Sequence, residues 1–380
     1  MKILFWTSAF WPRIGGIETY GLALLQALQA RGHQCVVITN KYLPKIPSYE
    51  IYQGIPVYRY EFDEALQQMQ AKQIGSILRQ IKKLIVDFSP DLIHLNIGFG
   101  RHLYYCSIIK KSCSLPIIIT MHGLLGVQEA GPVEIYQALL GVAVKVNAVS
   151  FALLEELRNS APQIIANSSC IYNAVPTPSI RPKTLAINPI KILCLGRLTY
   201  EKGYDLAITA FYTLRKRFSN VELIIAGDGN EKVKLETLVD ELELSSCVQF
   251  VGRIEPAAVY ELINSATMVV VPSRYEAFGL TAIEAAHMAR PVIATRTGGL
   301  VEIVRHLETG LLVSREDSDA LSDAMYILAS NINMATLLGK QARVNVEHNF
   351  HIEATTNRYQ QLYEETLRSR EHFHEATIHC

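Results

Sequence analysis

Residues 190–226 read IKILCLGRLTYEKGYDLAITAFYTLRKRFSNVELIIA. The apolar runs at 190–195 and 221–226 are typical of buried strands, and the apolar residues between them recur at helical spacing over 202–218. Gly196 and Gly203 interrupt the passage from the first strand to the helix, as a turn there requires. This order of strand, loop, helix and strand predicts a parallel sheet flanked by helices.

The same alternation extends in both directions from this stretch. Downstream, it predicts helices at 230–243, 256–264 and 279–288 and strands at 247–251, 267–271 and 291–295. Upstream, it predicts strands at 2–6, 36–40, 55–60, 91–95 and 116–121, a weaker strand at 146–150, and helices at about 17–31 and 65–87. A proline-spaced stretch at 176–189 separates the two series, as at a domain boundary.

We therefore expect an α/β protein with two Rossmann-like, doubly wound domains that face each other across a cleft. The first domain is predicted over 1–178 and the second over 187–350. A helical pattern at 352–370 is too short to form a domain and is expected to pack back on the N-terminal domain. Ligands of such folds bind at the carboxyl ends of the strands, where the loops gather.

The composition places the chain among globular enzymes. Of its 380 residues, 49% are apolar and 19% charged, and the net charge of zero gives no indication of nucleic-acid binding. Its seven cysteines are scattered without a C-x-x-C pair, which argues against a disulfide framework or a zinc site. There is no signal-peptide pattern and no run of the ~20 apolar residues that a membrane span needs. We expect a cytoplasmic protein.

The charge is distributed unevenly along the chain. Residues 1–185 carry 17 basic against 11 acidic residues, and the remainder carries 19 against 25. A basic first half could face an anionic acceptor or the cytoplasmic face of a membrane, or the asymmetry is incidental. Residues 72–83, KQIGSILRQIKK, interleave basic and apolar residues as an interfacial helix does. A core-facing helix with a solvated basic face gives the same pattern.

Several loops carry residues suited to an anionic ligand. Arg197 and Lys202 leave the first strand of the second domain, and paired cations there would stabilise a diphosphate as its bond breaks. A solvated basic loop is the alternative. Gly15 and Gly16 stand between the first strand and the first helix, where glycine lets backbone amides approach a phosphate or simply makes a tight turn.

The most informative segment, 272–286, reads PSRYEAFGLTAIEAA and follows the predicted strand 267–271. Glu276 lies in the loop, and Gly279 permits close backbone approach where a helix begins. Glu284 lies inside that otherwise apolar helix, where a carboxylate must find hydrogen-bond partners or remain costly. The hydroxyl groups of a ligand would supply them. A salt-bridged core glutamate is the alternative.

Two acidic motifs have simpler explanations than ligand binding. Asp317 and Asp319 form a D-x-D string like those that hold a divalent ion, but they precede a helix start, where acids cap. We therefore expect capping and no metal. Asp228, in the Gly-Asp-Gly turn after the strand 221–226, is also expected to cap the helix that follows.

Taken together, these motifs resemble those of the family-4 glycosyltransferases, which are retaining enzymes of the GT-B fold. The spacing of Glu276 and Glu284 matches the family's E-x₇-E motif. The other matching segments, in chain order, are GG at 15–16, DLIH at 91–94, TMHG at 120–123, IYNAVP at 171–176, GRLTYEKG at 196–203, AGDG at 226–229 and ATRTGGLVEIV at 294–304.

The resemblance implies roles for residues of the second domain. Arg197 and Lys202 would hold the donor diphosphate and neutralise the leaving group. Glu276 would contact hydroxyls of the transferred sugar, and Glu284 would accept those of the ribose. Backbone amides facing sugar or phosphate would come from Phe278, Gly279 and Leu280. Independently of the resemblance, the backbone at Arg253 and Ile254, after the strand 247–251, could contact a flat base.

In the first domain, the resemblance implies that Gly15 and Gly16 bind a donor phosphate through backbone amides. His122 would lie beside the reaction centre and position sugar or acceptor. The chain departs from the family pattern at Gly123, where many relatives carry an acid, and at Ala174, where Asn-Gly is commoner. At the first departure, the acceptor side lacks the acid that many relatives carry.

The resemblance therefore implies a retaining transferase that moves a hexosyl group from a nucleoside-diphosphate sugar, UDP-sugar being favoured over GDP-sugar. The acceptor would be a sugar, a polysaccharide or a lipid-linked acceptor, and no cofactor is expected. A nucleotide-sugar epimerase of the same fold and a non-catalytic carbohydrate-binding relative are the alternatives. An NAD-dependent oxidoreductase is disfavoured because no G-x-G-x-x-G opens the first helix.

Overall fold

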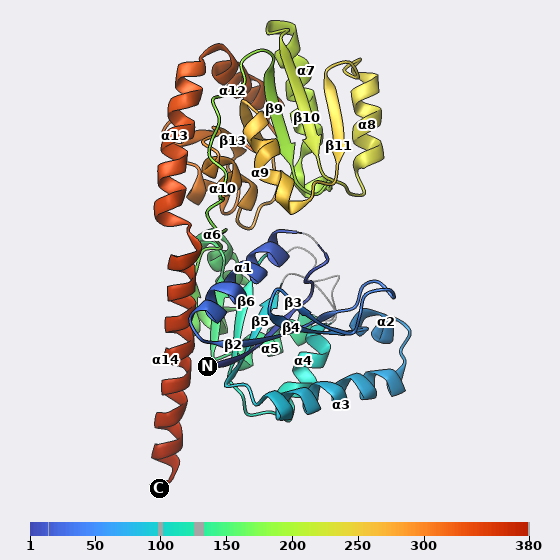
Figure 1. Ribbon diagram of the computed structural model, residues 1–380, viewed down its shortest axis with the longest axis vertical. Helices are drawn as coiled ribbons and strands as arrows, with labels where there is room; N and C mark the ends of the chain where they lie inside the picture. The colour runs from blue at the N-terminus through green and yellow to red at the C-terminus, as the bar shows by residue number, and fades with distance from the viewer. Residues whose placement is uncertain (14, 98–101, 125–132, 379–380) are drawn as a thin grey trace. The chain divides into compact units, whose positions relative to one another are not determined.

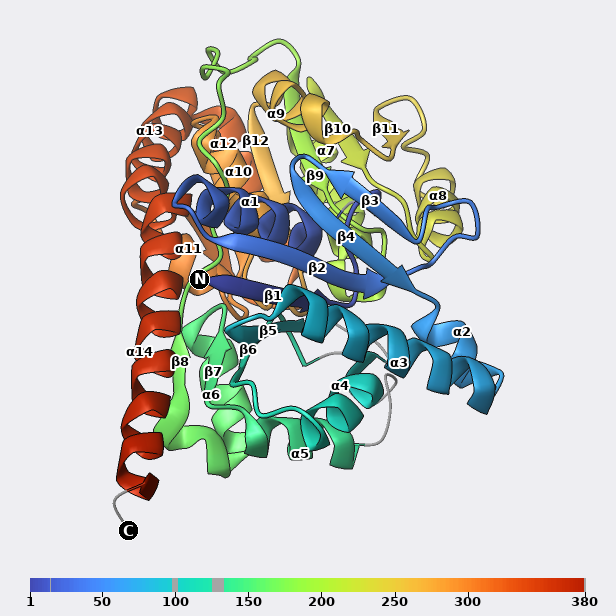
Figure 2. The same ribbon diagram turned by 60° about the horizontal axis from the view of Figure 1, so that its bottom comes forward.

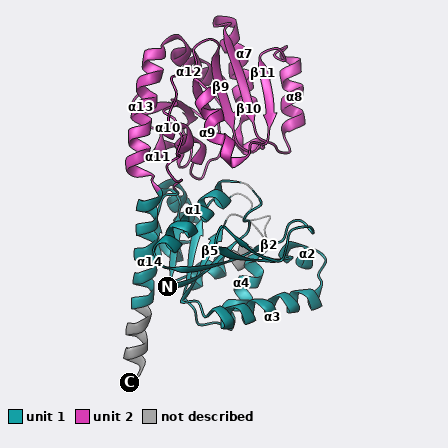
Figure 3. Cartoon of the chain, in the orientation of Figure 1, with its two compact units in different colours: residues 1–173, 352–380 teal, residues 174–351 magenta. Residues whose placement is uncertain are grey.

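The computed structural model describes residues 1–13, 15–97, 102–124 and 133–378. It divides into two compact units, shown in Figure 3. Unit 1 comprises Met1–Asn173 and Ile352–Cys380, and unit 2 comprises Ala174–His351. Each unit contains one sheet covered by helices, which confirms the predicted α/β class.

Unit 1 contains an eight-stranded sheet in the order β3-β4-β2-β1-β5-β6-β7-β8. Neighbouring strands are parallel except for β3, which is antiparallel to β4. The strands are β1 (Lys2–Thr7), β2 (Gln34–Asn40), β3 (Tyr49–Tyr52), β4 (Ile55–Tyr60), β5 (Leu92–Ile97), β6 (Ile117–Met121), β7 (Lys145–Ala148) and β8 (Ser168–Cys170). The central strands are buried on both faces, which is why they read as continuous apolar runs.

The helices of unit 1 cover both faces of its sheet, with α1 on one face and α3, α4 and α5 on the other (Figures 1 and 2). They are α1 (Gly16–Ala30), α2 (Phe62–Gln67), α3 (Ala71–Phe88), α4 (His102–Lys111), α5 (Val133–Val142), α6 (Phe151–Ser160), the 3₁₀ turn η1 (Pro162–Asn167) and α14 (Ile352–Ile378). Among the described residues, no helix is both long enough and apolar enough to cross a bilayer.

The C-terminal helix α14 packs beside α1 and places two tyrosines in the core of unit 1. The Tyr363 hydroxyl lies 2.7 Å from Nδ1 of His94, and Asn147 Nδ2 donates to the Tyr359 hydroxyl at 2.9 Å. Both tyrosines have no exposed surface. Buried polar groups cost free energy unless they are paired, so these bonds fix where α14 docks.

Unit 2 contains a six-stranded parallel sheet in the order β11-β10-β9-β12-β13-β14. The strands are β9 (Ile190–Leu195), β10 (Val221–Ala226), β11 (Val248–Gly252), β12 (Met268–Val271), β13 (Val292–Thr295) and β14 (Gly310–Val313). Numbered within the unit, this order is 3-2-1-4-5-6, the doubly wound Rossmann order, which reverses between β9 and β12. A crevice for ligands is therefore expected at the carboxyl ends of these two strands.

The helices of unit 2 form two groups around its sheet. In one, α7, α8 and α12 pack together over a large apolar core, and in the other α10 packs against α9 and α13. The elements are η2 (Tyr200–Lys202), α7 (Tyr204–Arg217), α8 (Lys232–Glu241), α9 (Pro256–Ser265), α10 (Leu280–His287), α11 (Leu300–Ile303), α12 (Ser318–Ser330) and α13 (Ile332–Asn349).

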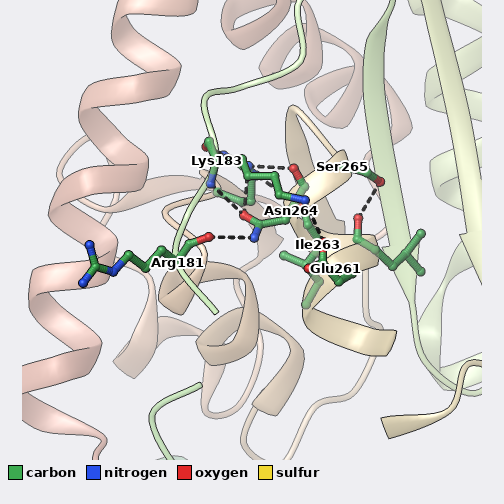
Figure 4. Close-up of polar contacts among 8 residues, drawn as sticks. Arg181, Lys183, Glu261, Ile263, Asn264 and Ser265 are labelled. Carbon is green, nitrogen blue, oxygen red and sulfur yellow. Dashed lines mark hydrogen bonds and ion pairs between the residues drawn. The ribbon is translucent and has the colours of Figure 1, made fainter. Parts of the chain in front are cut away.

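The segment that leads into β9 is anchored to α9, as Figure 4 shows. The side chain of Asn264, which is almost fully buried, donates to Arg181 O at 2.9 Å and accepts from Lys183 N at 3.0 Å. Lys183 Nζ forms an ion pair with Glu261 at 2.8 Å. The buried guanidinium of Arg290 also donates to Lys183 O. From residue 181 onward, this segment is therefore an integral part of unit 2.

The structure differs from the sequence expectations in one helix and three edge strands, and it contains helices for which no range was predicted, namely α4, α5, α6, α11 and α13. The helix expected at 65–87 is two helices, α2 and α3, because Met69 adopts a positive φ of 50° between them. The edge strands β3, β8 and β14 were not predicted. They have three or four residues each, too few for a period-two pattern to show.

Helix α3 has the orientation of an ordinary core-facing helix. Its residues Ile77, Ile81 and Leu84 are buried in unit 1, while the basic residues of 72–83 are exposed. Since the apolar face packs on the protein, it is not available to insert into a lipid interface. The core-facing alternative for this stretch is therefore the one that the structure supports.

Candidate functional site

The loops that follow β9 and β12 run side by side at the point where the strand order of unit 2 reverses. The amides of Arg274 and Tyr275 donate to Glu201 O at 2.8 and 3.2 Å. Gly203 has a φ of 67°, and a Cβ there would lie 2.2 Å from Pro272 O. Only glycine permits this approach. The local sequence thus joins the two predicted motif loops into one site.

Lys202 and Glu276 form an ion pair within this site. Lys202 Nζ lies 2.7 Å from Glu276 Oε2, and Ser273 Oγ donates to the same oxygen at 3.3 Å. The two side chains are only 22% and 14% exposed, so the pair is largely shielded from solvent. The side chain of Arg197, in contrast, is 57% exposed, and its Nη2 lies 4.0 Å from Glu201 Oε1, at the limit of an ion pair. The site therefore has one cation held in place and one free to move towards an anion.

The loop after β12 ends at the N-terminus of α10. Gly279 is the N-cap residue, with a φ of 118° that favours glycine, and it has no side chain with which to cap the first turn. The first amides of a helix lack intrahelical partners and attract anions. Phe278 is buried and contacts the Phe350 ring edge-on, which fixes the backbone just before Leu280. The predicted group of Phe278, Gly279 and Leu280 thus surrounds an uncapped helix start.

Glu284 lies in α10 with a carboxylate that, among the described residues, forms no hydrogen bond and no ion pair. The salt-bridged alternative for this residue is therefore wrong. Although the side chain keeps some exposed surface, burial among its neighbours raises its pKa to about 7. A carboxylate in such a place needs hydrogen-bond donors from outside the protein.

The loops after β10 and β11 continue the same edge of the sheet. Gly196 N donates to Ala226 O at 3.0 Å, and Gly227 N donates to Gly252 O at 2.8 Å. These bonds place Arg253 and Ile254, the predicted base contacts, two strands away from the loop of Arg197. Within the described part of the chain, the exposed Arg253 side chain has no ion-pair partner, and Ile254 is half-buried.

Two further glycines support the Glu276 loop. A Cβ on Gly298, whose φ is 46°, would lie 1.8 Å from Glu276 O, and one on Gly299 would lie 2.6 Å from Phe278 O. Gly299 N also donates to Glu276 O at 3.1 Å. The sequence contained the signal, two adjacent glycines after a strand, but it could not show which backbone they touch.

In unit 1, His122 follows β6 and has both ring nitrogens engaged. Nε2 lies 2.7 Å from Asn96 Oδ1, and Asn173 Nδ2 donates to Nδ1 at 3.3 Å. Although the ring keeps some exposed surface, desolvation by its surroundings lowers its pKa to about 3. His122 is therefore neutral at physiological pH, with the proton assigned to Nε2 because the amide oxygen of Asn96 accepts it.

The Gly15–Gly16 turn opens α1, with Gly15 as an extended N-cap that provides no side chain. Glu18 lies in the first helical turn, with its Oε1 3.5 Å from Arg13 Nε. Its carboxylate lies so close to Gly15 that a Cβ there would be 2.6 Å from Oε2. An anion bound at this helix start would therefore lie close to the negative charge of Glu18.

The acidic motifs have mixed outcomes. Asp317 accepts from Ala320 N at 2.8 Å as the N-cap of α12, which confirms the expected cap. The cap expected of Asp228 is wrong, because α8 begins only at Lys232 and Asp228 accepts from Gly229 N instead. In the described ranges, no three His, Cys, Asp or Glu side chains are grouped as they would be around a metal ion.

Comparisons with known families match both units. The model for glycosyl transferases group 1 matches residues 177–345, and the model for glycosyltransferase family 4 matches residues 14–179. Among curated relatives, the gpi3 subunit of the phosphatidylinositol N-acetylglucosaminyltransferase of Schizosaccharomyces pombe is 26% identical over 328 residues. That alignment covers 83% of this chain and 70% of the relative.

Solved structures share the fold over nearly the whole chain. Sucrose-phosphate synthase from Thermosynechococcus elongatus aligns with a TM-score of 0.82 and 23% identity, covering 97% of this chain and 100% of that one. Anabaena HepE, crystallised with UDP-glucose, aligns with a TM-score of 0.77 and 20% identity, covering 97% and 100%. The predicted GT-B fold is thereby confirmed. With both units matched, the chain belongs to the family-4 glycosyltransferases, a family of retaining enzymes that use nucleotide-sugar donors.

Proposed function

We propose that this protein transfers a hexosyl group, with retention of configuration, from a nucleoside-diphosphate sugar bound in unit 2. UDP-sugar is favoured over GDP-sugar as the donor, and the acceptor is a carbohydrate or a lipid-linked acceptor. One observation carries the proposal: the shielded Lys202–Glu276 ion pair lies at the β9/β12 reversal point. HepE, which has the same fold, was crystallised with UDP-glucose.

The cations of the site supply the electrostatic part of the mechanism. As the bond between sugar and diphosphate breaks, negative charge develops on the leaving phosphate. Lys202 is held beside it by Glu276, and the exposed Arg197 closes on it from the same loop. Fixed cations stabilise such charge without reorganisation, which lowers the barrier.

The two glutamates of the motif serve different parts of the donor. Glu276 accepts hydrogen bonds from hydroxyls of the transferred sugar while its other oxygen stays with Lys202. Glu284 accepts from the ribose hydroxyls, the donors that its unpaired carboxylate lacks. Amides at the start of α10 face the sugar or phosphate, and Arg253 and Ile254 contact the base.

On the side of unit 1, His122 positions a sugar or acceptor hydroxyl and does not act as a general base. A pKa near 3 makes the neutral imidazole a very weak base at physiological pH. Gly15 and Gly16 remain predicted phosphate contacts. Peripheral contact with an anionic membrane, if the acceptor is lipid-linked, would be electrostatic, through the exposed basic face of α3.

Donor turnover tests the proposal. The protein is incubated with UDP- and GDP-sugars, and release of the nucleoside diphosphate is followed over time. We expect slow release by the wild type and at least a hundredfold loss in Lys202→Ala, within the range for removing a charge that stabilises a transition state. Lys234→Ala, which removes a surface lysine paired with Glu231 at 2.8 Å, should leave the rate unchanged.

Three results would count against the proposal or against its site. If neither donor class releases its nucleotide, the transferase activity is refuted. A change of sugar configuration without such release would indicate the epimerase instead. Full turnover in Lys202→Ala would leave a transferase but place its donor site elsewhere.

A further inference from the structure

One arginine ties together the segments on which Lys202 and Glu276 are mounted. Arg274 is two residues before Glu276, and its side chain is only 12% exposed. Its two terminal nitrogens donate to the two carboxylate oxygens of Asp205 at 2.7 Å each, and Nε donates to Glu316 Oε1 at 2.7 Å. Paired parallel bonds of this kind fix geometry as well as adding energy.

The remaining contacts of Arg274 reach the 3₁₀ turn η2, which ends at Lys202. One terminal nitrogen donates to Tyr200 O at 3.0 Å, and the guanidinium lies 4.1 Å from the centroid of the Tyr200 ring. Tyr200 and Asp205 thus stand on either side of Lys202 in sequence, and Arg274 holds both.

The guanidinium of Arg274 and the carboxylates that it contacts stabilise one another's charges. The hydrogen bonds of Asp205 and Glu316 raise the pKa of Arg274 above its usual value. Burial alone would raise the pKa of Asp205, but its bonds to Arg274 outweigh burial and lower it. Arg274 and Asp205 therefore stay ionised over the physiological range, so their paired bonds act as a permanent clamp.

We propose that Arg274 is a positioning residue of the donor site. It locks the loop that carries Lys202 to the loop that carries Glu276, so that the lysine meets the donor diphosphate in one geometry. The inference rests on the function proposed above and extends it to a residue that does not touch the donor. Arg274 therefore affects the contact between Lys202 and the donor phosphates, and it does not affect the contacts to the base or the ribose.

Unit 2 offers a matched control arginine. Arg217 pairs with Asp323 at 2.5 Å and lies 3.9 Å over the Tyr326 ring. Like Arg274, it therefore combines an ion pair with an aromatic contact. It lies at the far end of α7, about 18 Å along the helix from Asp205. Comparing the two variants thus separates the effect of losing any paired arginine of unit 2 from the effect of losing the one beside Lys202.

A double-mutant cycle, measured by calorimetry, tests the inference. Two ligands are compared. The first is whichever of UDP and GDP the wild type binds more tightly, and the second is the corresponding nucleoside, which has no phosphates. In Arg274→Met we expect nucleoside diphosphate affinity to fall about tenfold, as for residues coupled in one network. Nucleoside affinity should change less than twofold. In a Lys202→Ala background, adding Arg274→Met should have no further effect. Arg274→Lys should restore part of the loss, and Arg217→Met should resemble the wild type.

Each alternative outcome is distinct. If Arg274→Met has the same nucleoside diphosphate affinity as Arg217→Met, Arg274 does not position Lys202. The same conclusion follows if Arg274→Met lowers that affinity equally in the wild-type and Lys202→Ala backgrounds. If the nucleoside is weakened as much as the diphosphate, the effect is a general loss of structure. If Arg274→Met does not fold, the same comparisons are made with Arg274→Lys. If the wild type binds neither nucleoside diphosphate, the proposed function fails and takes this inference with it.

Discussion

At the scale of single residues, Glu284, a proposed ribose contact, differs from the structural carboxylates of the same unit. Structural carboxylates of unit 2, such as Asp205 and Asp317, have protein partners within hydrogen-bond distance. Among the described residues, Glu284 has none, and its pKa is raised to about 7 by burial. The protein thus keeps a carboxylate at a cost in stability that only an external hydrogen-bond donor offsets.

This raised pKa makes donor binding depend on pH. An acid with a pKa near 7 is mostly protonated below that pH and then accepts fewer hydrogen bonds from a ribose diol. Affinity for a UDP-sugar should therefore rise between pH 5.5 and 8, by up to about 30-fold if only the ionised form binds. In Glu284→Gln the profile should be flat. A sugar nucleotide is the right probe because its diphosphate does not titrate in this range. If affinity for the UDP-sugar rises with pH in Glu284→Gln as steeply as in the wild type, Glu284 does not bind the ribose hydroxyls.

At this scale the sequence pointed to most residues of the proposed donor site and missed the residues that support them. Lys202 and Glu276 could be found because each lies in a loop that directly follows a predicted strand, and Glu284 because it is a charged residue in an otherwise apolar helix. Arg274 could not be assigned, because its partners Asp205 and Glu316 are far from it along the chain. Contacts of that kind exist only once β12 has been placed beside β9.

At the scale of elements, backbone approach between loops sets the shape of the site. Gly298 and Gly203 bring neighbouring loops so close that a single methyl group would not fit. The strands and helices around them follow from apolar periodicity, which the sequence displays. The register between loops depends instead on the strand order 3-2-1-4-5-6, which no local pattern encodes.

Gly298→Ala tests this account of the loops. A Cβ there would lie 1.8 Å from Glu276 O, so the Glu276 loop must shift. We expect donor turnover to fall at least tenfold, since small misplacements of reacting groups cost rate steeply. Gly32→Ala is the control, because Gly32 also has a positive φ, of 83°, but open space around it. It should cost about 1 kcal/mol of stability and no activity. Equal turnover in the two variants would contradict the account.

At the scale of the whole molecule, the chain returns to its first unit after completing its second. Helix α14 belongs to unit 1 through buried polar bonds to the sheet, with His94 held between the Tyr363 hydroxyl and Thr120 Oγ1 at 2.7 and 2.8 Å. Desolvation lowers the pKa of His94 to about 3, so this network is neutral. The sequence predicted a C-terminal helix, but its buried partners could not be read from periodicity.

Removing the Tyr363 hydroxyl should therefore loosen this docking. Tyr363→Phe leaves a ring nitrogen of His94 buried without its partner, which should cost about 1–3 kcal/mol of unfolding free energy. Tyr104→Phe, at a residue 36% exposed, should cost almost nothing. Denaturant unfolding of both variants measures the difference. Equal stability would mean that the network does not hold α14.

The central claim, retaining transfer at the unit 2 site, is tested most directly by the anomeric form of the first product. A UDP-α-sugar is incubated with the protein without acceptor, so that water takes the sugar, and proton NMR follows the released anomers before mutarotation mixes them. We predict the α-anomer first, from the wild type but not from Lys202→Ala. The β-anomer first, or equal release by Lys202→Ala, would contradict the account.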